Sequence, residues 1–342
     1  IDPGLIGDVV TGCVTQVGEQ GANVRRLGVL LSRLPKEVPA VSLNRMCGSS
    51  QQAVHFAAQA IAAGDVDFAI AGGVESMTRV PMFSDIGGGF HTLNPELGKR
   101  YELVHQGESA ERIAERYGFC REELDEWGYL SHKRAARATE EGRFSAQILP
   151  LEGLDAEGRP FLLTRDEGVR PDVDYEKMLA LKPVFRENGV VTAGNSSQIS
   201  DGAAALLLGD REKALALGLR PRARFLARVV VAGDPTLQLL EVIPAAKKAL
   251  ERAGLSLRDV DVIEVNEAFA SVVLAFLREL GADPEKVNPN GGAIAHGHPL
   301  GATGAVLMTK LLYELERTGG EFGLQVMCIG HGQATATVIQ RL

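Results

Sequence analysis

The chain has 342 residues, of which 45% are hydrophobic, and its formal net charge is −8. This length favours two compact units or two fused halves, and the charge argues against a protein that binds nucleic acid or a membrane surface. No apolar stretch is long enough to span a bilayer. The four cysteines show neither zinc-site spacings nor a disulfide framework, so we expect free thiols in a reducing compartment, the cytoplasm.

The first informative elements surround Cys47. A short apolar strand ends at this cysteine, and the alanine-rich segment 51–63 predicts a buried helix. The run 66–71 predicts a second strand, which closes on the pair Gly72-Gly73. A strand, a turn, a helix and a strand in this order are typical of a layered α/β protein.

A more charged region follows, roughly from residue 79 to 197. It contains two amphipathic segments, 109–117 and 122–141, which predict helices, and then turn-rich sequence. We interpret it as an inserted, partly exposed subdomain. The core resumes at Asp201, where an apolar run fits a buried strand.

The plan of the first half recurs near the C-terminus. A strand over 260–265 leads to Asn266, a glycine-rich segment over 290–304 opens a further helix, and a strand over 323–327 reaches Cys328. Two halves with the same order of elements suggest an internal duplication. The predicted fold class is therefore α/β, with two similar halves.

Cys47 is the first candidate for chemistry. It lies where a strand turns into a helix, and the free N–H groups and positive dipole end of a helix favour a thiolate. The following Gly48 would let a substrate approach the sulfur closely. The alternative is a buried structural cysteine, which behaves as a small hydrophobic residue.

Three other residues are weaker candidates when each is taken alone. His298 precedes a proline, which is preferred at the first helical position, so we expect it at a helix start, as a general base or oxyanion donor. Cys328 could move protons at the end of a strand or simply pack in the core. Asn266 could be an ordinary helix cap.

Five motifs change this assessment because they occur together. They are Asn44-Arg-Met-Cys47-Gly-Ser-Ser, Gly72-Gly-Val-Glu75-Ser-Met, Asn266-Glu-Ala-Phe, Asn290-Gly-Gly-Ala-Ile-Ala-His-Gly-His298-Pro and Cys328-Ile-Gly330. In their order and spacing the chain resembles the thiolase family over essentially its whole length. The resemblance implies a layered αβαβα core in two halves, residues 1–78 with 198–215 and residues 216–342, and an inserted loop domain, residues 79–197, that holds coenzyme A.

The resemblance also implies an activity. Thiolases are acyltransferases that cleave 3-ketoacyl-CoA with CoA, as in β-oxidation of fatty acids, or condense acetyl-CoA with an acyl-CoA through an acyl-cysteine. Cys47 matches the nucleophile, His298 the group that activates it, and Cys328 the residue that moves the α-proton. One oxyanion hole resembles His298 with a water held by Asn266, and the other resembles the backbone N–H groups of Cys47 and Gly330. No metal or tightly bound cofactor is implied, and CoA is a co-substrate.

The expected contacts with CoA lie mostly in the inserted region. Arg170 matches an arginine at the adenine end, Ser197 a serine near the pantetheine, and Phe269 an aromatic residue of that channel. His105 belongs to the pantetheine loop, which reads His105-Gln106-Gly107 instead of the His-Met of the acetoacetyl-specific branch, and this leaves longer or bulkier acyl chains open. The partners expected are acyl-CoA and CoA, in a homodimer or homotetramer.

Two further departures from the family pattern stand out. The chain lacks the strand and helix that normally open a thiolase, and His296 and His331 occupy unusual positions, with space-filling favoured for His331. Two rival functions remain to be weighed. A decarboxylating ketoacyl synthase would carry a histidine in place of Cys328, and a non-catalytic lipid- or CoA-binding relative would not need all four candidate residues.

Overall fold

The computed structural model describes residues 1–87, 89–155 and 157–342. Its core contains two four-stranded sheets, with strand orders β2-β1-β3-β6 and β7-β10-β9-β8. The strands of the first sheet are β1 (Asp8–Gly12), β2 (Ala40–Leu43), β3 (Phe68–Ser76) and β6 (Asp201–Gly209). Those of the second sheet are β7 (Ala223–Ala232), β8 (Val262–Val265), β9 (Phe322–Ile329) and β10 (Gln333–Arg341).

The two sheets share one plan. In the first, β1 and β3 are parallel and β6 is antiparallel to β3. In the second, β8 and β9 are parallel and β10 is antiparallel to β9. The predicted α/β fold of two similar halves is therefore confirmed, and the second half carries β7 as an additional strand beside β10.

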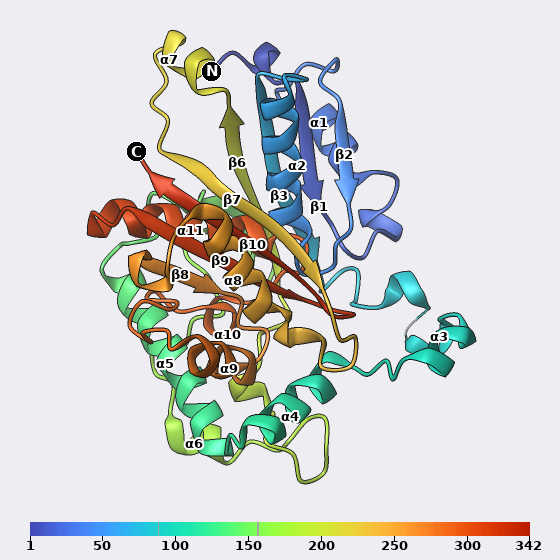
Figure 1. Ribbon diagram of the computed structural model, residues 1–342. Coiled ribbons are helices and arrows are strands. Elements are labelled where there is room, and N and C mark those ends of the chain that lie inside the picture. The colour runs from blue at the N-terminus through green and yellow to red at the C-terminus, as the bar shows by residue number, and fades with distance from the viewer. Residues whose placement is uncertain (88, 156) are drawn as a thin grey trace.

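Helices separate and cover the two sheets. The helices of the two halves are α1 (Val24–Leu31), α2 (Ser49–Ala63), α7 (Arg211–Ala216), α8 (Val242–Ala253), α9 (Ala270–Leu280), α10 (Ala293–His296) and α11 (Thr303–Thr318). The central layer is formed by α2, which packs on β1 and β3, and by α11, which packs on β8 and β9 and on α2 itself. The outer layers are α1, against β2, and α8, against β7 and β10 (Figure 1). This order of layers is αβαβα.

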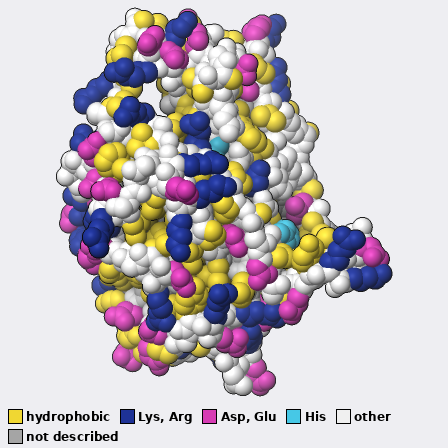
Figure 2. All heavy atoms as spheres, viewed as in Figure 1, with side chains coloured by type: hydrophobic (Ala, Val, Ile, Leu, Met, Phe, Trp, Pro, Cys, Tyr) yellow, Lys and Arg dark blue, Asp and Glu magenta, His cyan; other side chains and the backbone are white. Residues whose placement is uncertain are grey.

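The predicted inserted region lies below the second sheet in the view of Figure 1, where α4 and α5 are drawn in green. Its helices are α3 (Pro95–Arg100), α4 (Gln106–Tyr117), α5 (Arg121–Glu140) and α6 (Tyr175–Leu179), and its hairpin joins β4 (Leu151–Leu154) to β5 (Pro160–Leu163). Because α4 packs on α9 and α5 packs on α9 and α10, the region is held against helices of the second half. The segment that carries α3 projects from the body, and Figure 2 shows side chains of both charges on it.

Three local predictions were wrong, and one alternative is excluded. The pair Gly72-Gly73 was expected to end the strand, but β3 continues through both residues. A Cβ atom on Gly72 would lie 2.2 Å from Ala204 O, and one on Gly73 would lie 2.0 Å from Gly301 O. Close packing, and not a turn, therefore explains both glycines. The strand from Asp201 lies at the edge of its sheet and is half exposed, not buried.

The two other differences concern helix starts. α9 begins at Ala270, so Asn266 lies in the connection before the helix and is not its cap. α11 begins at Thr303, so the proline after His298 lies in the preceding turn and not at the first helical position. In the described part of the chain, no helix combines the length and the apolar character needed to cross a membrane.

Candidate active site

Four candidate residues from distant parts of the sequence meet between the two halves. Asn266 directly follows β8, and Cys328 is the penultimate residue of the parallel strand β9, so both lie at the carboxyl edge of the second sheet, where α/β proteins commonly bind ligands. The Asn266 Nδ2 atom lies 3.6 Å from Cys328 Sγ and 3.5 Å from His298 Nε2. Cys47 approaches from the first half; burial raises the pKa of its thiol, and the nearby backbone N–H groups of Cys47 and Gly330 oppose that shift.

The hydrogen bonds of His298 define its tautomer. Its Nδ1 atom lies 2.6 Å from the hydroxyl oxygen of Thr303, and that hydroxyl donates its own proton to Pro299 O at 2.9 Å. The hydroxyl must therefore accept from Nδ1–H, which leaves a lone pair on Nε2 facing Asn266. Burial also lowers the pKa of His298 to about 4, so the ring is neutral near pH 7 and can accept a proton.

Both cysteines are thiols in the resting site. Burial, followed by the proximity of Cys328, raises the pKa of Cys47 to about 12, and burial raises the pKa of Cys328 to about 11. α2 begins at Ser49, right after the Gly48 cap, so Cys47 does lie at a helix N-terminus as predicted. The predicted preference for a thiolate is not realised at rest, because burial raises the thiol pKa by more than nearby N–H groups lower it. The site therefore holds a neutral thiol–imidazole–thiol set, and charge must develop during the reaction.

Gly48 has a packing role in the structure. A Cβ atom at this position would lie 2.3 Å from Ile329 Cδ1, so the side-chain-free residue lets α2 start directly against β9. Cys47 itself packs in an apolar cluster with Val14, Met77, Leu300, Leu307, Met327 and Ile329, and Met46 and Met82 border the cluster. Methionine side chains are flexible and polarizable, so this wall can adapt its shape.

A buried carboxylate fastens the His298 loop to the first half. Glu75, on β3, accepts hydrogen bonds from the backbone N–H groups of Val14 at 2.8 Å, Thr15 at 3.0 Å and Gly301 at 2.8 Å, and from the amide of Gln20 at 2.9 Å. Because Gly301 lies three residues after His298, these bonds hold the histidine against the half that carries Cys47. This contact explains the glutamate of the second sequence motif.

A second carboxylate supports Asn266 from behind. Glu267 is fully buried and accepts hydrogen bonds from Trp127 Nε1 at 3.1 Å, Ser131 Oγ at 2.7 Å, Asn288 Nδ2 at 2.9 Å and the Ile294 N–H at 3.2 Å. It thus joins α5 of the inserted region to the glycine-rich loop. Together these four hydrogen bonds restrict the backbone beside Asn266.

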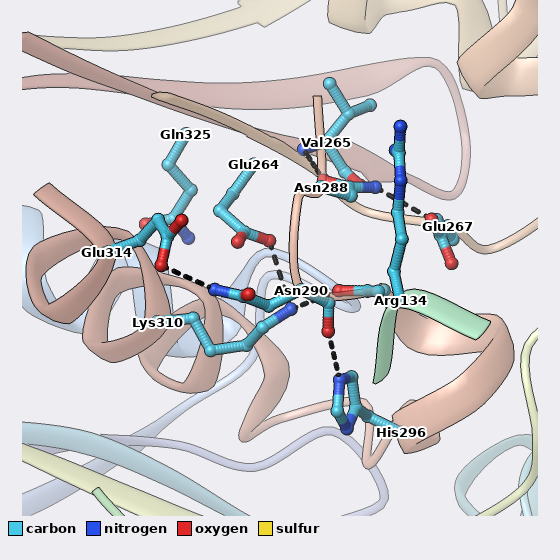
Figure 3. A network of polar contacts seen from close by, with 12 residues as sticks. Arg134, Glu264, Val265, Glu267, Asn288, Asn290, His296, Lys310, Glu314 and Gln325 are labelled. Carbon is cyan, nitrogen blue, oxygen red and sulfur yellow. Dashed lines mark hydrogen bonds and ion pairs between the residues drawn. The ribbon is translucent and has the colours of Figure 1, made fainter. Parts of the chain in front are cut away.

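Figure 3 shows that this support continues into a buried ionic network. The Lys310 ammonium of α11 lies 3.3 Å from Glu264 Oε2 of β8 and donates to Gly291 O. Burial raises the pKa of Glu264 to about 7, although the ammonium opposes the shift. His296, one of the unusual histidines, contacts Asn290 O at 2.9 Å and Asp166 Oδ2 at 2.9 Å, so it braces the loop before His298.

The predicted CoA contacts fall into two places. Phe185 stacks on His105, with centroids 5.1 Å apart, and lies edge-on to Phe269 at 5.9 Å, so these three rings form one aromatic row. Ser197 lies beside the row, because its N–H donates to Ala268 O at 2.9 Å. Arg170 lies elsewhere, exposed beside α5, where its N–H donates to His132 Nδ1 at 3.2 Å.

Sequence reasoning missed several residues of the site. Phe185 and Thr303 carry no motif signal, and Gln106 was noted only as a departure in the pantetheine loop, with no contact assigned to it. Burial raises the pKa of the Cys47 thiol, and the side chain of Gln106 opposes this shift from beside Gly330. The Asn266 Oδ1 atom is also buried without a hydrogen-bond partner among the described residues, so it can accept from a water or ligand.

Comparisons with known proteins show what the whole chain is similar to. Residues 1–212 match the family model of the thiolase N-terminal domain, and residues 219–341 match that of the thiolase C-terminal domain. The chain is 46% identical to a steroid 3-ketoacyl-CoA thiolase of Mycobacterium tuberculosis, covering 100% of this chain and 84% of the relative. It is 43% identical to a 3-oxoadipyl-CoA/3-oxo-5,6-dehydrosuberyl-CoA thiolase of Escherichia coli, covering 100% and 89%. The acetyl-CoA acetyltransferase of Bacillus anthracis superimposes with a TM-score of 0.90 at 36% identity, covering 100% of this chain and 89% of that structure.

Proposed function

Because the chain belongs to the thiolase family of acyltransferases, we propose that it transfers acyl groups between CoA and 3-ketoacyl-CoA through an acyl-Cys47 intermediate. One observation carries the assignment of roles. A neutral histidine with a free Nε2 lone pair lies within hydrogen-bonding range of an asparagine that also contacts a second buried thiol. A protein that only bound CoA would have no need of this set.

The first half-reaction transfers the acyl group to Cys47. His298 Nε2 takes the thiol proton, the sulfur attacks the 3-keto carbonyl, and the bond between the α- and β-carbons breaks to release the enolate of acetyl-CoA. The backbone N–H groups of Cys47 and Gly330 are placed beside the sulfur, where they can stabilise the oxyanion on the attacked carbonyl. Fixed donors of this kind commonly contribute about 3–4 kcal/mol each.

Cys328 then completes the acetyl-CoA product by giving its proton to the enolate carbon. The enolate oxygen lies toward His298 and Asn266, whose Nδ2 contacts the Cys328 sulfur at 3.6 Å. In the second half-reaction, the CoA thiol gives its proton to the Cys328 thiolate and attacks the acyl-Cys47, His298 returns its proton to the departing Cys47 sulfur, and the shortened acyl-CoA leaves. Condensation is the same sequence in reverse, and the kinetics are ping-pong because one product leaves before CoA enters.

The substrate we propose is a 3-ketoacyl-CoA longer or bulkier than acetoacetyl-CoA. The relatives named for steroid 3-ketoacyl-CoA and 3-oxoadipyl-CoA support this choice, as does the methionine-rich wall beside Cys47. The pantetheine would run along the row of His105, Phe185 and Phe269, past Ser197, and the nucleotide end would reach Arg170. CoA would act as co-substrate, with no tightly bound cofactor.

We propose that the protein works as a homodimer, or as a tetramer of dimers, in the cytoplasm. β2 lies at a sheet edge, and neighbouring apolar side chains are exposed there, with Val41 at 43% and Leu31 of α1 at 90%. Such an edge next to apolar surface favours pairing with a second copy. The four free cysteines suit a reducing compartment.

A thiolysis assay tests the proposal. Purified protein is mixed with CoA and either acetoacetyl-CoA or a medium-chain 3-ketoacyl-CoA, and loss of the substrate is followed for the wild type, Cys47→Ala and Cys328→Ala. We expect the medium-chain substrate to be preferred and both variants to lose turnover. Cys328→Ala should still form the acyl-enzyme from acyl-CoA, whereas Cys47→Ala should not. Absence of turnover on both substrates in folded wild type would favour the non-catalytic CoA-binding function instead.

A further inference from the structure

The side chain of Gln106 reaches the centre of the site from the inserted region. Burial raises the pKa of the Cys47 thiol, and the Gln106 side chain is one of the nearby groups that oppose this shift. A Cβ atom on Gly330 would lie 2.8 Å from Gln106 Nε2, so the amide nitrogen fills the space beside that backbone. The same Cβ would lie 2.9 Å from Met46 Cε, so Gln106 lies beside Gly330 and the residue that precedes Cys47, two positions to which the proposed function assigns the acyl-transfer step.

The first turn of α4 holds Gln106 in place. His105 caps this helix by accepting from Gly107 N–H at 3.0 Å, and a Cβ on Gly107 would lie 2.3 Å from the Phe185 ring. The turn is thus fixed between its cap and an aromatic ring. As the first residue of α4, Gln106 also projects from the positive end of a 12-residue helix.

We propose that Gln106 is a further catalytic residue, whose side-chain N–H donates to the Cys47 sulfur and stabilises it as a thiolate for attack on the acyl group. This inference rests on the proposed function. The sulfur then has three donors, the Gln106 amide and the backbone N–H groups of Cys47 and Gly330. The titratable group that faces it is Cys328, whose charge would oppose the thiolate, and the proposed function makes His298 the acceptor of its proton.

The Cys47 proton moves to His298 Nε2, and the sulfur keeps the electron pair while Gln106 donates to it. A bond then forms between the sulfur and the acyl carbon, the bond from that carbon to its leaving group breaks, and the leaving enolate takes its proton from Cys328. The Gln106 N–H loses a charged acceptor when the thioester forms, so its contribution is greatest just before attack.

The expected effect follows from opposing changes in thiolate population and nucleophilicity. Losing one hydrogen bond to a charged sulfur lowers the thiolate population about 10- to 100-fold. A more basic thiolate is about three- to eightfold more nucleophilic, so the two changes partly cancel. Gln106→Met should therefore slow the reaction of Cys47 with iodoacetamide about 3- to 12-fold.

The experiment measures alkylation of each cysteine in the full chain by peptide mass spectrometry at pH 8. Exposed Cys120, on the surface, serves as the internal reference in the same molecule. Gln147→Met is the matched control, since this glutamine lies in the same inserted region and its amide donates to Arg143 O at 3.0 Å, away from Cys47. Gln106→Glu keeps the shape of the side chain but places an acceptor near the sulfur, so it should slow Cys47 more than Gln106→Met does. Unfolding temperatures verify that each variant is folded.

Alkylation requires no turnover, so its result is independent of the proposed substrate, which the thiolysis assay tests separately. A Cys47 rate in Gln106→Met within twofold of wild type, relative to Cys120, would overturn the proposal. So would a Gln106→Glu variant that reacts as fast as wild type. Unchanged alkylation together with an altered acyl-chain preference would make Gln106 a wall of the acyl site and would equally reject the role in stabilising the thiolate.

Discussion

The hydroxyl of Thr303 provides a sharp test of how the base is oriented. It accepts from His298 Nδ1 at 2.6 Å and donates to Pro299 O at 2.9 Å, so it holds the ring with its lone pair on Nε2. Thr303→Val keeps the branched shape and removes the acceptor. The Nδ1–H group would then be buried without a partner, both in the resting ring and in the imidazolium that forms when Cys47 gives up its proton.

The magnitude follows from that lost acceptor. Leaving a buried donor unsatisfied costs about 1–3 kcal/mol, and more when the group is charged. The imidazolium forms on the way to the transition state, so most of this cost should appear in the barrier. We expect kcat/KM for thiolysis to fall about 5- to 150-fold, with KM for CoA little changed.

A control on the same helix separates this effect from general damage to α11. Thr309 donates to Ala305 O at 2.9 Å, as Thr303 does to Pro299, but it does not touch His298. Thr309→Val should therefore retain wild-type kcat/KM, and Thr303→Ser should recover most of the activity lost in Thr303→Val. If Thr303→Val and Thr309→Val were equally active, the orientation of His298 by Thr303 would be refuted.

Three further predictions concern stability. Gly48→Ala should lower the free energy of unfolding by about 1–3 kcal/mol in urea titrations, because its Cβ would lie 2.3 Å from Ile329 Cδ1, whereas Gly98→Ala, with open space around its Cβ, should not destabilise. Glu267→Gln should lower the free energy of unfolding by about 1–3 kcal/mol, since the new amide NH₂ would face N–H and O–H groups that now donate to the carboxylate. A variant as stable as wild type would contradict this role of Glu267. His298 has a folded pKa of about 4, below its unfolded value near 6.5, so the unfolded chain binds more protons between these values and stability falls as the pH drops through that window. Removing this proton uptake in His298→Asn should make the loss of stability between pH 7 and 4.5 about 2–3 kcal/mol smaller than in wild type, and an equal loss would reject a neutral buried histidine.

Much of the site could be predicted because its residues occur at local transitions in the sequence. Cys47 was placed correctly between a strand and a helix, and Cys328 near the end of a strand, since an apolar run that stops at glycine is visible without tertiary information. His298 was expected on a helix start because proline often occupies that position. In the structure the turn continues for four more residues, held by the bond from Gly301 to Glu75, which joins positions 226 residues apart.

Other features depend on neighbours that sequence patterns do not reveal. Gly72 and Gly73 look like a turn, yet they are required because two other chain segments pass within contact distance of β3. The apolar run after Asp201 looks buried, yet β6 lies at a sheet edge, where alternate side chains such as Leu207, 50% exposed, face outward. Gln106 lies 59 positions from Cys47, so only the packing of α4 against the site reveals their contact.

The arrangement explains why such a buried site need not be charged at rest. Desolvation raises the pKa of Cys47 to about 12 and lowers that of His298 to about 4, so an ion pair between them is unfavourable in the free protein. Donors nevertheless surround the sulfur from three segments that are fixed by separate anchors: the start of α2, the turn at Gly330 and the start of α4. Dipoles held in this way cost little reorganisation when charge appears, and their effect is strongest in a dry site. The same burial that suppresses the resting thiolate therefore increases the benefit of each donor once a substrate is present, and weakening a single anchor should slow the reaction more than it destabilises the fold.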